Sequence, residues 1–298
     1  MTPDERASIR LQGVREGRLN LEPIRSQANP LIKDLRSLQQ RRRRHQERAF
    51  VVEGTRLVSD VLAAGIEPRH ILLRSDVVDA LLPTLPPALH PRVRVADEAV
   101  FASVSDLPHP QGILAVVPML ETPPDHLQDL AAPLLLVIAG VRDPGNLGTL
   151  FRSAAGAGVD HIFLTDETVD PYNPKAVRAG MGGHFRVSFS IADTATLANV
   201  LCSCHVVGLA EADGVLAYDN AVWTGSSAII IGGEAAGASE AVRTLATTTV
   251  GIPLAGGVES LNAAVAGSLL VFEAARQRRA AAQAGVRRPS APGRDVVS

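Results

Sequence analysis

The chain has 298 residues, more than the ~250 at which a single hydrophobic core tends to stop growing, so two domains are expected. Its formal charge of -2, taken alone, argues against a nucleic-acid partner. Two cysteines, Cys202 and Cys204, exclude a disulfide framework. The longest apolar run, residues 131–141, is too short to span a membrane, and no apolar stretch follows the first charges, so we expect a cytoplasmic protein without a signal peptide.

The average charge conceals two basic ends. Residues 1–50 carry +6 and residues 276–298 carry +5, which leaves -13 for residues 51–275. Only two of the 29 basic side chains are lysines, so the positive charge sits on guanidinium groups, which suit phosphate contacts. A codon bias toward arginine explains this excess equally well. Residues 1–24 and 281–298 lack hydrophobic periodicity and are predicted to be a flexible basic arm and tail.

Residues 25–118 predict a small α/β domain. Leu31, Leu35 and Leu38 recur at helical spacing, and a basic run of Arg41, Arg42, Arg43 and Arg44 follows. Further on, the pattern predicts strands at 49–54, 71–73, 92–95 and 112–117 and a helix at 55–64. The basic run is either a phosphate-binding surface for RNA or a solvated group of charges. Prolines mark residues 119–131 as a linker.

Residues 132–280 predict a second domain with a doubly wound parallel sheet. The apolar run at 134–139 is typical of a parallel strand that is buried on both faces. Further strands are predicted at 162–164, 206–209, 228–231 and 250–252, separated by helical patterns, before a last helix at 261–280.

Three loops of this domain, each directly after a predicted strand, carry most of its glycine and polar residues. Ligands bind at such carboxyl ends in open α/β sheets, so the three loops form one candidate site. In the first loop, Asn146 precedes Arg152 by six residues; a helix-capping Asn and a solvated Arg would also explain this pair. The second loop places Glu234 after two glycines. In the third, Ser260 is a natural N-cap, which would put Asn262 in the first turn of the last helix.

Two other site types are disfavoured. The dinucleotide fingerprint and the phosphate-binding lysine motif are missing, which argues against a nicotinamide-dependent oxidoreductase. Cys202, Cys204 and His205 are too closely spaced for an ordinary zinc site, so no metal is predicted.

Taken together, the three loops resemble the three motifs of the SpoU/TrmH family of RNA ribose 2'-O-methyltransferases. The matching pieces are Asn146 with Arg152, Gly232-Gly233-Glu234, and Ile252-Pro253-Leu254 followed by Ser260-Leu261-Asn262. The region from Asn29 to Val117 is similar to the family's ribosomal-protein-like accessory domain, which binds substrate RNA. One position departs from the pattern, because Ala235 stands where the family commonly has glycine.

The resemblance implies a trefoil-knotted (SPOUT) catalytic domain in a homodimer that uses S-adenosylmethionine. It assigns catalytic roles to Asn146, Arg152, Glu234 and Asn262. It assigns the cofactor to Gly232, Ile252, Leu254, Ser260 and Leu261. It also favours the RNA-binding role for the basic run, with 23S ribosomal RNA as the expected substrate. A transfer-RNA methyltransferase and a non-catalytic RNA-binding protein with the same fold are the alternatives.

Overall fold

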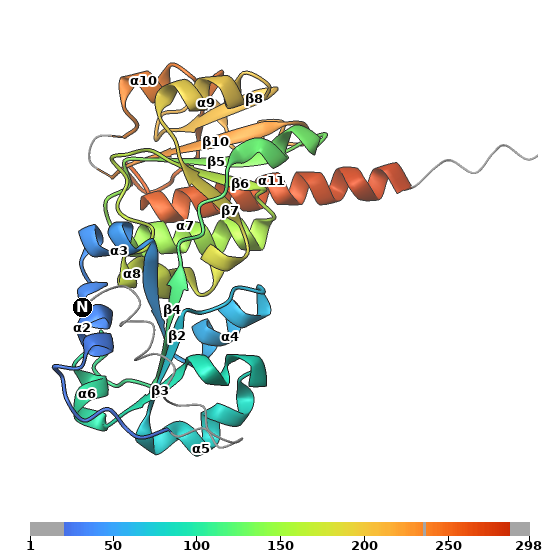
Figure 1. The fold of residues 1–298 in the computed structure, drawn as a ribbon. Coiled ribbons are helices and arrows are strands. Elements are labelled where there is room, and N and C mark those ends of the chain that lie inside the picture. Colours follow the sequence, from blue (N-terminus) through green and yellow to red (C-terminus); the bar gives the residue numbers. More distant parts are fainter. Residues whose placement is uncertain (1–20, 235–236, 287–298) are drawn as a thin grey trace, which may run out of the picture. The chain divides into compact units, whose positions relative to one another are not determined.

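The computed structural model describes residues 21–234 and 237–286, and it divides into two compact units (Figure 1). Unit 1 contains the chain up to Leu120 together with Asp170–Phe185. Unit 2 contains Glu121–Val169 and the chain from Arg186 onward. Among the described residues, no helix is both long enough and apolar enough to cross a membrane.

Unit 1 is built on a four-stranded mixed sheet with the strand order β1-β4-β2-β3. Strand β4 pairs antiparallel with β1 and β2, whereas β3 runs parallel to β2. The strands are β1 Ala49–Glu53, β2 His70–Arg74, β3 Val93–Ala96 and β4 Ile113–Pro118. The helices are α2 Pro30–Ser37, α3 Arg41–Glu47, α4 Thr55–Ala63, α5 Val78–Leu81, α6 Glu98–Ala102 and α8 Pro174–Gly180, with single 3-10 turns at Ser75–Val77, Leu82–Thr84, Pro87–Arg92 and Gly183–Phe185. The predicted strands of this region are confirmed.

The two faces of this sheet are covered by different helices. Ile32 and Leu35 of α2 and Phe101 of α6 form one buried cluster with Leu72 and Leu114 of the sheet. Helix α4 contacts β1 and β4. Apolar side chains spaced three and four residues apart on α2 and α4 therefore bury one face of each helix, as the sequence predicts.

The segment Asp170–Phe185 belongs to unit 1, although it lies between two strands of unit 2 in the sequence. The Phe50 ring of β1 is fully buried, and its centroid lies 4.9 Å from the ring of Tyr172 and 6.5 Å from that of Phe185. Helix α8 also contacts β1. This segment of the predicted domain at 132–280 thus packs with unit 1, because the core of unit 1 includes its side chains.

Unit 2 is built on a seven-stranded sheet with the order β7-β6-β5-β10-β8-β11-β9, in which every pairing is parallel. The strands are β5 Leu134–Ala139, β6 His161–Leu164, β7 Ser188–Ile191, β8 Val206–Ala210, β9 Leu216–Ala217, β10 Ser227–Gly232 and β11 Thr248–Gly251. The helices are α7 Pro144–Ala157, α9 Thr194–Leu201, α10 Glu240–Arg243 and α11 Ala263–Val286, with a 3-10 turn at Pro124–Asp129. The predicted parallel sheet is confirmed.

Helices cover both faces of the unit 2 sheet, with α9 and α10 on one face and α7 and α11 on the other (Figure 1). On the first face, Leu201 and Val242 pack against Val137 and Ile230. On the second, α7 and α11 pack so closely that a Cβ atom at Gly267 would lie 2.4 Å from Leu150 Cδ2. All six residues of β5 are buried, which confirms the prediction of a strand enclosed on both faces.

Both chain ends differ from the predicted boundaries where they are described. The backbone N–H of Ile24 donates to Val95 O at 2.8 Å, so the sheet contacts of unit 1 begin inside the predicted arm of residues 1–24. Helix α11 continues to Val286, six residues beyond its predicted end at 280. The remaining parts of the predicted arm and tail, residues 1–20 and 287–298, lie outside the described residues, as does Ala235.

Candidate active site

The three predicted loops follow β5, β10 and β11, and therefore lie at the same edge of the parallel sheet. The structure brings together a side chain from each of them. Asn146 Nδ2 donates to Glu234 Oε1 at 2.6 Å, and Asn262 Nδ2 donates to Asn146 Oδ1 at 2.9 Å. These three side chains, which we call the amide chain, form one hydrogen-bonded line whose last member is a carboxylate.

The start of α11 fixes the direction of the amide chain. Asn262 Oδ1 accepts from the backbone N–H groups of Ala264 and Val265 at 2.9 and 3.2 Å. Because this oxygen caps the helix, the Asn262 amide must present its nitrogen to Asn146, and Asn146 must in turn present its own nitrogen to Glu234. The prediction that Ser260 is the N-cap is wrong: the helix begins at Ala263, and Asn262 itself caps it.

The first turn of α7 positions Asn146. Asp143 is the N-cap and accepts from the backbone N–H of Asn146 at 2.9 Å, and Pro144 occupies the first helical position, where its missing N–H costs nothing. Asn146 is therefore not the cap, and its side chain is free to join the amide chain. Arg152 lies farther along α7 and is exposed; in the described part of the chain, no hydrogen bond or ion pair joins it to the other predicted catalytic residues.

Two glycines allow close backbone contacts, one between the first and second loops and one within the second loop. A Cβ atom at Gly233 would lie 2.2 Å from the backbone oxygen of Gly140, and one at Gly232 would lie 2.5 Å from the backbone nitrogen of Ala238. A side chain at position 233 would push the first and second loops apart, and one at position 232 would open the turn of the second loop itself. Gly233 is thus required by the contact between the two loops, and Gly232 by the tight turn inside the second loop.

A cavity of about 410 Å³ lies beside the amide chain. Glu234 and Asn262 line it. Its walls also include all five residues predicted to hold a cofactor, Gly232, Ile252, Leu254, Ser260 and Leu261. Of the described residues that line it, the charged ones are Glu211 and Glu234, and none is a lysine, arginine or histidine. Such a site suits an uncharged or cationic ligand, and it offers no counter-charge to a phosphate.

Glu211 is the lining residue that the sequence analysis missed. It is the first residue after β8, which lies between β10 and β11 in the sheet. The sequence pattern that could have identified Glu211 is therefore the one used for the other loops, a polar residue directly after a buried strand.

Protein-family models match both parts of the chain. Residues 133–272 match the SpoU rRNA methylase family, and residues 29–115 match the MRM3-like substrate-binding domain. A 23S rRNA (guanosine(2553)-2'-O)-methyltransferase of Bacillus subtilis is 31% identical, with 85% of this chain and 98% of that protein covered. This chain belongs to the SpoU rRNA methylase family.

Solved structures of rRNA and SpoU methyltransferases resemble this chain over most of its length. An AdoMet-bound rRNA methyltransferase from Sinorhizobium meliloti superposes with a TM-score of 0.75 at 29% identity, covering 86% of this chain and 97% of that one. The SpoU methyltransferase AviRb from Streptomyces viridochromogenes, in complex with AdoMet, gives a TM-score of 0.74 at 26% identity, covering 84% and 98%. The resemblance stated from the three motifs is confirmed.

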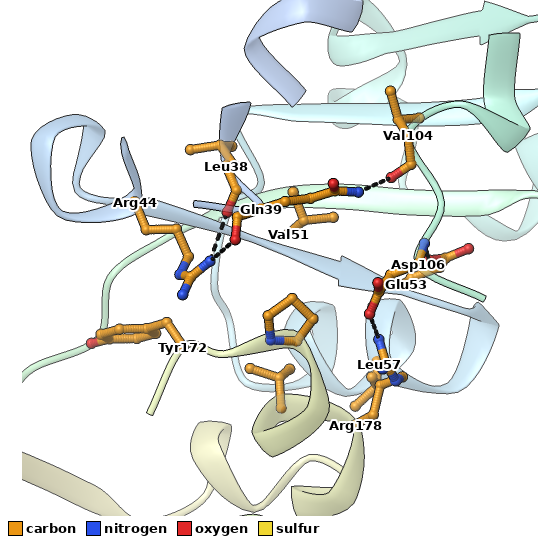
Figure 2. A pocket seen from close by; sticks show the side chains of 12 residues that line it. Leu38, Gln39, Arg44, Val51, Glu53, Leu57, Val104, Asp106, Tyr172 and Arg178 are labelled. Carbon is orange, nitrogen blue, oxygen red and sulfur yellow. Dashed lines mark hydrogen bonds and ion pairs between the residues drawn. The ribbon is translucent and has the colours of Figure 1, made fainter. Parts of the chain in front are cut away.

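In this SpoU family member, one of the four arginines predicted to contact RNA lies in the interior of unit 1. Arg44 is 2% exposed, and its Nε and Nη2 donate to Asp170 Oδ2 at 3.0 and 2.5 Å. Figure 2 shows its Nη1 donating to the backbone oxygens of Leu38 and Gln39. Asp170 is also buried and accepts from the backbone N–H of Tyr172. The prediction that Arg44 contacts RNA is therefore corrected. Each nitrogen of its guanidinium group donates a hydrogen bond inside the protein, so the group is not accessible to RNA.

The other three arginines of the run are accessible. Helix α3 consists largely of the run itself, and Arg41 and Arg42 are exposed on it. Arg43 is half-buried and pairs with Glu47, one turn later, at 3.0 Å. The helical spacing thus directs Arg44 inward while its three predecessors face outward.

Proposed function

We propose that this protein transfers a methyl group from S-adenosylmethionine to a ribose 2'-hydroxyl of 23S ribosomal RNA. The observation that carries the proposal is the amide chain at the edge of the cavity, which joins one residue from each family motif. The names of the relatives support this substrate, since they are rRNA methyltransferases that match this chain over most of its length.

The cavity fits this cofactor. Its volume of about 410 Å³ is within the ~300–1,000 Å³ usual for small-molecule sites, and its lining combines apolar side chains with two carboxylates. Gly232, Ile252, Leu254, Ser260 and Leu261 would hold it. When bound, S-adenosylmethionine supplies a methyl group on a positively charged sulfur, which the carboxylate of Glu234 favours. A dinucleotide would bring a pyrophosphate to walls that have no cationic side chain among the described residues.

The amide chain orients Glu234 toward the reaction. Its Oε1 is held by Asn146, which leaves Oε2 to accept the proton that the ribose hydroxyl loses as its oxygen forms the new bond to carbon and the carbon–sulfur bond breaks. Asn262 keeps the Asn146 amide from rotating, because it is itself held by the α11 backbone. Both asparagines are positioning residues, and the proton is received at the carboxylate.

Arg152 acts through its charge. A guanidinium donates hydrogen bonds and does not accept protons in proteins, so it cannot be the general base. On the exposed surface of α7 it is suited to grip the RNA phosphate next to the target ribose and to stabilise negative charge that develops on the ribose oxygen.

RNA is bound by unit 1 in this proposal. Its match to a substrate-binding domain supports the role, and Arg41, Arg42 and Arg43 supply phosphate contacts on α3. Aromatic residues make up 3% of the chain, too few for a base-stacking platform, so recognition rests on phosphates and on RNA shape.

The proposed oligomeric state rests on α11. Val265, Leu269 and Phe272 share one face of this helix and are 47%, 39% and 46% exposed. A row of large apolar side chains at this spacing fits a second copy of the chain, so we propose a homodimer. We further propose that unit 2 contains the trefoil knot that the family resemblance implies, and that the protein works in the cytoplasm.

Replacing Arg152 tests the reaction without disturbing the cavity. In the Arg152→Ala variant we expect methyl transfer to 23S rRNA to fall at least about 100-fold, because charge stabilisation at the reacting oxygen is lost, while the Kd for S-adenosylmethionine is unchanged. Arg152→Lys keeps the charge without the planar fork and should recover only part of the activity. An Arg152→Ala enzyme with near-normal turnover would contradict the proposal.

A further inference from the structure

We infer that Glu211 binds the ribose hydroxyls of the nucleoside cofactor, an inference that rests on the function proposed above. Glu211 and Glu234 are the two carboxylates of the cavity lining, and they follow neighbouring strands, β8 and β10. Glu234 is engaged with the amide chain, at the place where the methyl group must leave. Glu211 is therefore available to the part of the cofactor that does not react.

Backbone and side-chain contacts hold Glu211 in place before any ligand binds. Its backbone N–H donates to Val250 O at 3.0 Å, which extends the β8–β11 pairing by one step. Its Oε1 forms an ion pair with Nη1 of Arg243, at the end of α10, and the Glu211 side chain is only 21% exposed. A carboxylate fixed in this way loses little freedom when it accepts further hydrogen bonds.

The second carboxylate oxygen of Glu211, Oε2, is the atom that accepts the hydrogen bonds from the ribose. Within residues 21–234 and 237–286, no hydrogen bond to Oε2 of Glu211 is found, while Oε1 is occupied by Arg243. A carboxylate oxygen has room for two donors, which matches the vicinal pair of hydroxyls on a ribose.

The cofactor carries two kinds of hydrogen-bond donor, the ribose hydroxyls and the ammonium group of its methionine part. The ion pair between Glu211 and Arg243 favours the hydroxyls. Arg243, which also lies near the exposed Glu240, offsets the charge of Glu211. The Glu211 carboxylate therefore attracts an ammonium group less than an unpaired carboxylate does, but still accepts hydrogen bonds from neutral hydroxyls. The ammonium of the methionine part would instead need an unpaired carboxylate. The ribose is thus assigned to Glu211.

Isothermal titration with unreactive ligands tests this assignment. The ligands are S-adenosylhomocysteine, its 2'-deoxy and 3'-deoxy forms, and 5'-methylthioadenosine, which lacks the amino acid. For the wild-type protein we expect removal of a ribose hydroxyl to weaken binding about tenfold, the usual size for a hydrogen bond to a charged group. In Glu211→Gln this difference should shrink to less than about threefold, and 5'-methylthioadenosine should weaken by the same factor as S-adenosylhomocysteine.

The matched control is Glu240→Gln. Glu240 lies 3.6 Å from the same Arg243, but its side chain is 85% exposed and does not line the cavity, so this variant should keep the full tenfold discrimination. The inference is overturned if Glu211→Gln also keeps it, or if Glu211→Gln weakens S-adenosylhomocysteine but not 5'-methylthioadenosine, which would place the ammonium at Glu211. A wild-type protein that binds none of these ligands would contradict the proposed function itself, and this inference with it.

Discussion

The two units use polar side chains in opposite ways. In unit 1, Arg44 and Asp170 form an ion pair whose side chains are 3% and 4% exposed, surrounded by backbone partners. In unit 2, the contacts between Asn146, Glu234 and Asn262 lie at an exposed position beside a cavity. A closed network of this kind has no capacity left for a ligand, whereas an open one still has donors and acceptors to offer. Breaking the first should lower stability, and breaking the second should lower activity.

The largest effect is expected for Asp170→Asn. The substitution leaves the Arg44 guanidinium buried without its counter-charge, which should lower the free energy of unfolding by about 3–5 kcal/mol in urea denaturation followed by circular dichroism. Arg43→Gln is the control, because it removes the neighbouring but accessible pair with Glu47 and should cost less than ~1 kcal/mol. If both substitutions lowered the free energy of unfolding equally, the contrast between the buried pair of Arg44 and Asp170 and the accessible pair of Arg43 and Glu47 would be refuted.

Acid should destabilise both units in the same pH window. Burial lowers the pKa of His161 in unit 2 and of His184 in unit 1 to about 4, from the ordinary 6.5. The unfolded chain therefore binds more protons than the folded one between these values, so stability is full above pH 6.5 and is lost as the pH falls toward 4. Each histidine contributes up to about 3 kcal/mol to that loss.

The pH dependence of unfolding measures this loss. Replacing His161 with Phe should reduce the slope between pH 6.5 and 4 by about half, because the His184 contribution remains. A His161→Phe protein with the wild-type slope would show that His161 does not titrate in this window.

A pair of substitutions at Asn262 separates its two roles. Asn262→Ser keeps a helix cap but loses the amide nitrogen that holds Asn146, so we expect near wild-type stability with methyl transfer reduced about 100-fold. Asn262→Ala should lose both, with an additional stability cost of about 1 kcal/mol. Thermal unfolding and single-turnover kinetics give the two readouts. Full activity in Asn262→Ser would show that the amide chain does not position Glu234.

The smallest effect is expected on the surface of α3. Replacing Arg41 and Arg42 with Gln should weaken RNA binding and reduce the magnitude of the slope of log K against log salt by about 1.5, since each phosphate contact contributes roughly 0.7 to 0.9. Arg56→Gln, an exposed arginine of α4 in the same unit, is the control and should keep the wild-type slope. An unchanged slope in the double variant would remove α3 from the RNA-binding surface.

Much of the sheet and the candidate site of unit 2 could be predicted from local sequence patterns, because those patterns indicate which strands are buried and where they end. The buried strand at 134–139 and the three loops after strands were predicted correctly, and the structure brings Asn146, Glu234 and Asn262 together at one sheet edge. Ser260 was mistaken for the cap, since both it and Asn262 are good capping residues and only the helix start distinguishes them.

What could not be predicted depends on contacts between distant residues. The sequence does not distinguish Arg44 from the three arginines before it. Its burial depends on the carboxylate of Asp170, 126 residues later. The membership of Asp170–Phe185 in unit 1 likewise follows from aromatic packing on Phe50, which no local periodicity records. Glu211 was missed because a single acidic residue after a strand is a weak signal without its neighbours in the sheet.

The central claim is that this chain methylates a ribose 2'-hydroxyl of 23S rRNA through the open network of unit 2. The most direct test incubates unmodified 23S rRNA with S-adenosylmethionine and the purified protein, and maps 2'-O-methyl groups by their resistance to alkaline cleavage. We predict a discrete new ribose methyl group with the wild-type protein and none with Asn146→Ala under the same conditions. Methylation on a base, or equal ribose methylation by both proteins, would contradict the account.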